Sequence, residues 1–345
     1  MTAAPMTETV SPTVPRERSL QIGLLLGLLI VILFVISLAT GRAALGLGEL
    51  LIERVWNDDE LLWIVLSEIR LPRAILAILV GGALGLSGAV LQGYLRNPLA
   101  EPGLIGASSM AAFGAVLMLY FGVAAQFVWA LPAGGIAGAL VGVTIVYMLA
   151  GKAAGPLTLI LAGVAVNALA GALTSLALSL APSPFAVQEI VFWLLGSLAD
   201  RSFDHVWLAL PFIAIGCAML FATGRGLDAL TLGVDAAASL GVRLPRLQVQ
   251  IVLGTALAVG AAVSVTGVIG FVGLVVPHLL RPLVGNRPAP LLGLSALGGA
   301  ALTQAADIVV RLIPSGLEPK LGVVTAMIGA PFFLWLLTKT RRTLA

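Results

Sequence analysis

The sequence has little charge and almost no cysteine or histidine. Only 10% of its 345 residues are charged, against roughly 25% in a typical soluble domain. Cys217 is the single cysteine, which excludes an intrachain disulfide and a cysteine metal cluster. Only two histidines occur, and the sequence shows no clustered carboxylates and no nucleophile elbow. We therefore predict that this chain has no metal site and no catalytic residues.

A phosphate-binding loop of the form Gly-x-x-x-x-Gly-Lys-Ser/Thr is also missing. Lys152 follows Gly151, but the preceding glycine and the following hydroxyl residue are absent. The chain is therefore not expected to hydrolyse ATP by itself. Any ATP and Mg that its activity needs would be bound by another protein.

Hydrophobic residues make up 59% of the sequence. A membrane-spanning helix needs about 20 apolar residues, and we predict an all-α polytopic membrane protein with a single domain at residues 20–342. Residues 1–19 are predicted to be a disordered cytoplasmic tail. The run at 271–284 is short and contains Pro277, so we expect a broken helix buried against protein. The apolar runs place ten spans at 20–39, 74–95, 104–122, 127–149, 157–181, 206–222, 247–267, 271–284, 291–310 and 321–338.

Ten spans place both chain ends on the same side of the membrane, and the positive charges indicate which side. With the N-terminus inside, inner segments hold twelve lysines and arginines and outer segments hold seven. Short loops rich in these residues stay in the cytoplasm, so we expect both termini there. A short amphipathic helix at 185–198 is expected on the outer surface.

The stretch from Arg70 to Ser109 contains one predicted span with a charged, proline-containing segment at each end. It begins Arg70-Leu71-Pro72-Arg73, and its apolar span is followed by Arg96-Asn97-Pro98-Leu99-Ala100-Glu101-Pro102. Proline restricts the residue before it and lacks an amide donor, so both ends mark helix boundaries. Glycines inside the span let another helix approach closely. Judged from these properties alone, the stretch is a well-packed transmembrane helix.

The same stretch resembles the first signature of the FecCD-type permeases, which belong to ABC importers of iron–siderophore complexes, haem and cobalamin. The resemblance covers residues from about 60 to 340. A second block resembles the other signature of this family, and it consists of residues 270–278, Arg281, Ala306-Asp307, Arg311 and Gly329-Ala330-Pro331-Phe332.

This resemblance implies the transmembrane subunit of an importer in the bacterial inner membrane. It would work as a homodimer with two ATPase subunits and one periplasmic substrate-binding protein, without a cofactor of its own and without nucleic acid. The cargo would be a metal chelate, haem or an iron–siderophore, moved by ATP-driven alternating access. Cobalamin is the alternative cargo. An ion-coupled secondary transporter is less favoured, because such carriers bury ionisable groups at the membrane midplane and here nearly all charges fall in loops or at span ends.

Three arginines near the outer membrane boundary are the first candidate site. Guanidinium groups suit carboxylates, but each arginine could equally extend to the interface or pair with a nearby acid such as Asp307. The family resemblance implies that Arg70, Arg73 and Arg311 meet acidic residues on the binding protein.

The segment at about 224–245 is the longest predicted cytoplasmic connection and the second candidate site. It could be an ordinary loop that glycines divide into short helical turns. It also resembles the coupling helices of the family, which sit in a groove of the ATPase subunit. The residues that carry this resemblance are Leu232, Gly233, Ser239, Leu240, Gly241 and Val242.

The third candidate lies at the inner end of the second span. Asn97, Pro98 and Leu99 form either a simple turn capped by Asn97 or, as the resemblance implies, a cytoplasmic gate. His278 follows Pro277 and invites comparison with a haem ligand. Its predicted place in the inner half of a span favours a structural hydrogen bond instead. Asn167 is a polar residue inside a span, so it either lines a pathway or bonds two helices together.

Overall fold

The computed structural model describes residues 16–41, 63–151, 155–314 and 318–344, and every element in these ranges is a helix. The first half contains α1 (Arg16–Ala39), η1 (Val65–Arg70), α4 (Leu71–Tyr94), η2 (Pro102–Ile105), α5 (Ala107–Tyr120), α6 (Val123–Gln126), α7 (Ala130–Ala150) and α8 (Pro156–Ser179). The second half contains α9 (Pro184–Leu194), α10 (Phe203–Phe221), α11 (Gly224–Leu230), α12 (Val234–Ser239), α13 (Leu244–Thr266), α14 (Val272–Leu280), η3 (Arg281–Val284), α15 (Pro288–Leu312) and α16 (Leu321–Leu344).

Each of the ten predicted spans corresponds to one of these helices, which confirms the all-α polytopic prediction. In the described part of the chain, seven helices are long and apolar enough to cross a membrane, and α5, α14 and α16 provide shorter apolar segments. The first span starts at Arg16 and not at residue 20, and its first turn carries Glu17, a charge that the helix dipole favours there. The remainder of the predicted tail, residues 1–15, lies outside the described residues.

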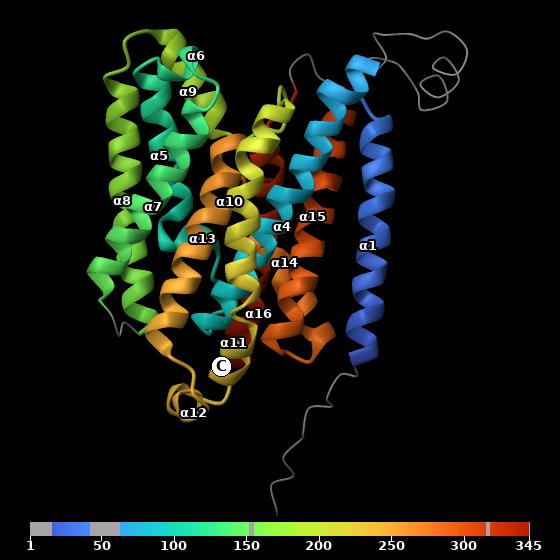
Figure 1. Cartoon of the computed structure of the whole chain (residues 1–345), viewed down its shortest axis with the longest axis vertical. Helices are drawn as coiled ribbons and strands as arrows, with labels where there is room; N and C mark the ends of the chain where they lie inside the picture. The colour runs from blue at the N-terminus through green and yellow to red at the C-terminus, as the bar shows by residue number, and fades with distance from the viewer. Residues whose placement is uncertain (1–15, 42–62, 152–154, 315–317, 345) are drawn as a thin grey trace, which may run out of the picture.

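The helices run side by side between two ends of the molecule (Figure 1). Helices α11 and α12 lie at the end where α1 begins and α16 finishes, and α6 and α9 lie at the opposite end. Both described chain ends therefore share one end, as an even number of spans requires. Following the positive-charge prediction, we call this the inner end and the opposite one the outer end. Helix α9 matches the short helix expected at 185–198.

Helix α4 lies in the core of the bundle, beside α14 and α15 (Figure 1). A Cβ atom added at Gly81 or Gly85 would collide with backbone oxygens of α15, so these two backbones touch directly. Small residues allow such an approach between membrane helices, as the glycines of this span predicted. By contrast, only 6% of the apolar window of α1 is buried, against 78% for α4.

Candidate functional site

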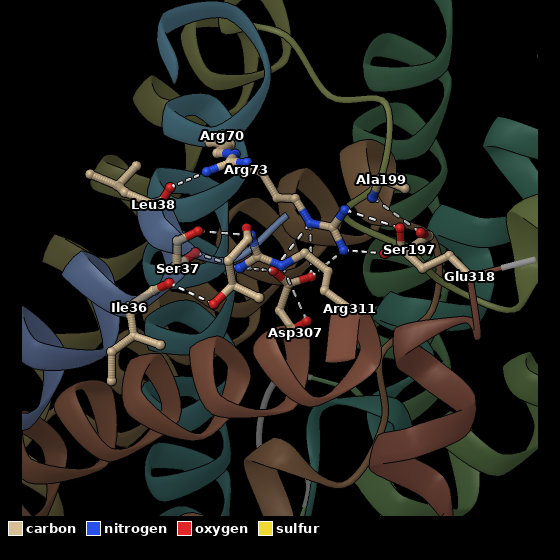
Figure 2. A network of polar contacts seen from close by, with 11 residues as sticks. Ile36, Ser37, Leu38, Arg70, Arg73, Ser197, Ala199, Asp307, Arg311 and Glu318 are labelled. Carbon is tan, nitrogen blue, oxygen red and sulfur yellow. Dashed lines mark hydrogen bonds and ion pairs between the residues drawn. The ribbon is translucent and has the colours of Figure 1, made fainter. Parts of the chain in front are cut away.

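A buried ion cluster joins α4 to α15 at the outer end (Figure 2). Arg73 donates through Nε and Nη2 to one carboxylate oxygen of Asp307, at 3.0 and 2.8 Å. Arg311, one turn further along α15, pairs with the other oxygen at 3.0 Å. A pair between an outer arginine and Asp307 was one of the alternatives left open by the sequence, and Arg311 lies four residues from Asp307. The bond from Arg73 could not be expected from sequence proximity, because its partner lies 234 residues away.

Two of the outer arginines also bind the last carbonyl groups of α1 (Figure 2). Arg70 donates to the carbonyl of Leu38 at 2.8 Å, and Arg311 donates to the carbonyls of Ser37 and Thr40, each at 2.8 Å. The final carbonyls of a helix have no partner within the helix and carry partial negative charge, so a cation stabilises them. These bonds fasten the outer end of a helix that otherwise buries little of its surface.

All three arginines line one recess of about 260 Å³ at the outer end, together with Glu318 and Asp200. The structure thus brings together the three residues singled out in the sequence. Their exposed fractions are only 3% for Arg70 and 8% for Arg73 and Arg311. Arg73 already donates to Glu318 as well as to Asp307. A carboxylate from another protein would therefore enter the recess in competition with Glu318.

The inner-end segment presents two large apolar side chains. Leu232 is 69% exposed and Leu240 is 65% exposed, so neither contributes much to the core. Gly233 and Gly241 have φ angles of +115° and +85°, a region that residues with a Cβ rarely adopt. These two glycines form the turns on either side of α12, so the segment is two short helices and not an irregular loop.

The other two residues of the predicted coupling set make contacts within the segment. The hydroxyl of Ser239 donates to the carbonyl of Asp235 at 2.9 Å, and the amide of Val242 donates to the carbonyl of Ala237 at 3.0 Å. They stabilise the shape of α12, whereas the exposed leucines provide its apolar surface.

Polar contacts fasten α11 to the core of the bundle. The carboxylate of Asp228 accepts from the backbone amide of Ala289 at 2.9 Å and from Arg287 at 3.3 Å. Arg96, just after α4, donates to the carbonyl of Leu230. The inner segment is therefore linked directly to the inner ends of α4 and α15.

The turn predicted at the inner end of α4 is present. The side chain of Asn97 accepts from the amide of Leu99 at 2.9 Å, and the carbonyl of Asn97 accepts from the amide of Ala100 at 3.1 Å. Pro98 between them is exposed. These two bonds define a compact turn.

Two further polar residues have structural contacts. Asn167 of α8 donates to the carbonyl of Gly103 at 2.7 Å, so it bonds a helix to the η2 segment. His278 packs edge to face against Phe332 of α16, with ring centroids 5.7 Å apart. Among the described residues, no group of three or more histidine, cysteine, aspartate or glutamate side chains could hold a metal ion.

Two residues without a predicted role make contacts between distant segments of the chain. Gln92 of α4 bonds to α14 and to Arg281; it is a strongly polar residue in an otherwise apolar span, and that polarity is the signal that could have singled it out. Glu318 carried no signal in the sequence, because only its contact with Arg73 gives it a role.

The bundle and its two polar ends define a multi-pass helical membrane protein of the transport class. The chain belongs to the FecCD transport family, which matches residues 29–339. This finding confirms the resemblance on which the expectations about partners and cargo rest.

Relatives of known name cover most of the chain. It is 37% identical to the hemin transport system permease protein HmuU of Yersinia pestis over 92% of this chain and 96% of the relative. It is 39% identical to the Fe(3+) dicitrate permease protein FecD of Escherichia coli, over 83% and 89%. It is 41% identical to the cobalamin import permease protein BtuC of Halobacterium salinarum, over 79% and 73%.

A solved structure described as an inward-facing conformation of a metal-chelate type ABC transporter has the same fold. The TM-score is 0.82 at 35% sequence identity, and the match covers 92% of this chain and 99% of the other.

Proposed function

We propose that this chain is the transmembrane permease subunit of a bacterial ABC importer for haem or an iron–siderophore. The observation that carries the proposal is the match, over almost its whole length, to a permease named for hemin transport. Residues 20–342 form one permease domain in the inner membrane, with both termini in the cytoplasm. A second copy, two ATPase subunits and a periplasmic binding protein complete the importer, which moves its cargo by alternating access.

Cobalamin is the second candidate cargo. A permease named for cobalamin import is 41% identical to this chain, but the match covers 73% of that relative. The hemin permease is matched over 96% of its length, but the vitamin B12 permease BtuC of Salmonella typhi, 36% identical, is matched over 98%, so coverage does not separate the two cargoes and the uptake assay decides between them.

The function is tested by reconstitution in proteoliposomes. The chain is combined with its ATPase and its binding protein, and uptake of haem, a ferric siderophore and cobalamin is measured with and without ATP. We expect ATP-dependent uptake of an iron chelate, and no ATP hydrolysis by the chain alone. Uptake of cobalamin only would favour the second candidate. Uptake driven by an ion gradient without ATP would contradict an ABC importer.

The connection formed by α11 and α12 is proposed to couple this chain to the ATPase. Leu232 and Leu240 supply an exposed apolar surface at the inner end, and Asp228 links the segment to α15. The turn at Asn97, Pro98 and Leu99 is proposed to be the cytoplasmic gate that moves when the pathway opens.

Changing Leu240 to glutamate should abolish ATP-driven uptake without lowering thermal stability. Its side chain is 65% exposed, so the charge costs little in the isolated chain, but it would be desolvated in an apolar contact. ATPase co-purification and uptake measure the effect. Arg18→Gln, which makes the same charge change at the exposed inner end of α1, is the control and should keep transport. If the Leu240→Glu variant still assembles with the ATPase and supports normal uptake, the segment formed by α11 and α12 does not have the coupling role.

The outer recess is proposed to receive an acidic side chain of the binding protein. Reversing Arg73 itself is a poor test, because that residue also holds Asp307 and Glu318 inside the protein. A variant that frees the arginine is more informative.

Glu318→Gln should accelerate docking of the binding protein severalfold. It removes the carboxylate that competes for Arg73, and opposite charges across an interface mainly raise the association rate. Association kinetics across a salt series measure the effect, which should shrink as salt rises. Glu68→Gln makes the same charge change on an exposed residue of η1 and serves as the control. If both variants raise the association rate equally, the effect comes from the overall charge of the outer end, and the recess does not receive the binding protein.

A further inference from the structure

Helix α14 contains a break in its hydrogen-bond pattern. Pro277 lies inside this nine-residue helix and has no amide hydrogen, so the carbonyl of Gly273, four residues earlier, lacks its usual partner. An unsatisfied carbonyl inside a membrane protein is unfavourable unless a neighbouring group bonds it. The group that bonds it comes from α4.

The side-chain amide of Gln92 engages both ends of α14. Its nitrogen donates to the carbonyls of Gly273 and Leu274, at 3.3 and 3.2 Å. Its oxygen accepts from Arg281, which follows α14, at 2.7 Å. Gln92 is fully buried, so these bonds form away from solvent, where losing them would leave polar groups unpaired.

The start of α14 touches the segment that follows α4. A Cβ added at Gly273 would lie 2.8 Å from Cδ of Pro102, three residues after the proposed gate turn. Phe271, just before α14, has a φ of +68°, a strained conformation for a residue with a side chain. Nearby, a Cβ added at Gly88 would collide with the backbone of Gly273. The backbones of α4 and α14 therefore touch at the same place.

We propose that Gln92 is the positioning residue of a joint that makes α14 and the loop at 97–101 move together with α4. The same helix carries Arg73 in the outer cluster, about 28 Å from Gln92 along the axis. The joint would thus give the outer recess a rigid connection to the inner loop. This inference rests on the proposed transport function, because it concerns motion during the transport cycle.

The test measures distances between spin labels in the purified importer. Cys217 is replaced by serine, and cysteines for labelling are introduced at Leu99 in the loop and Leu279 in α14. A reference pair joins Leu99 to Leu157 of α8, whose side chain is 69% exposed. Distances are recorded without nucleotide and with a non-hydrolysable ATP analogue. We expect the reference distance to change and the Leu99–Leu279 distance to stay constant and narrow.

Variants of the joint decide the inference. Gln92→Leu should broaden the Leu99–Leu279 distribution and raise the ATP hydrolysed per cargo transported severalfold. Gln304→Leu is the matched control. Gln304 is equally buried, but neither polar atom of its side chain has a partner among the described residues.

Two results would overturn the joint. The first is a Leu99–Leu279 distance that changes with nucleotide as much as the reference pair does. The second is a distribution that stays narrow in Gln92→Leu. If the Leu99–Leu157 distance does not change with nucleotide, the gate role proposed above is contradicted. The widths of the Leu99–Leu279 distributions without nucleotide still test the joint.

Discussion

Replacing Asp307 with leucine is expected to destabilise the protein by about 3–5 kcal/mol, the cost of removing one partner from a buried ion pair. Asp307 is 1% exposed and is shared by Arg73 and Arg311. Its loss would leave two buried arginines without the carboxylate that they share. The outer end of α1 would also be held less firmly, because Arg311 bonds to that helix too. The measurement is the thermal unfolding midpoint of the detergent-purified chain.

The matched control for this prediction is the ion pair between Arg287 and Asp228. The Arg287 side chain is 65% exposed, and an exposed pair contributes about 0–1 kcal/mol. Arg287→Gln should therefore leave the midpoint almost unchanged. Similar midpoints for Asp307→Leu and Arg287→Gln would show that the outer cluster does not stabilise the fold.

The second large effect is expected from Gly88→Ala. The added methyl group would overlap the backbone of Gly273, which has no flexible end that could move aside. Helices α4 and α14 would have to separate, and the bonds from Gln92 would lengthen with them. Overpacking of this kind costs about 1–3 kcal/mol, sometimes more. We expect a lower unfolding midpoint, together with loss of ATP-driven uptake.

Gly171→Ala in α8 is the control for that substitution. Nothing lies within 4 Å of a Cβ at Gly171, and alanine favours a helix over glycine by about 1 kcal/mol. This variant should be neutral or slightly more stable. If Gly88→Ala is equally stable and keeps uptake, the close contact between α4 and α14 is not required for stability or transport.

The membrane helices of this protein can be predicted from the sequence alone. Apolar runs located ten helices of the described chain, seven of them long enough to cross a bilayer, because in lipid only a helix satisfies its own backbone along such a run. The position of Pro277 in a short run also predicted the broken character of α14. The three arginines were placed near one membrane boundary for the same reason, since charged residues concentrate where spans end.

The pairing of polar groups could not be predicted before the three-dimensional structure was known. Arg73 could be assigned to a local acid from its sequence, but it bonds to Asp307, 234 residues away. Gln92 looked like an interruption of its span, yet it bonds to the carbonyl that Pro277 leaves free. Hydropathy is a property of a single segment, so it predicts which residues of that segment lie in the bilayer. The pairing of two polar groups depends on how helices from distant parts of the chain pack together, and direct contact between glycines sets that packing here.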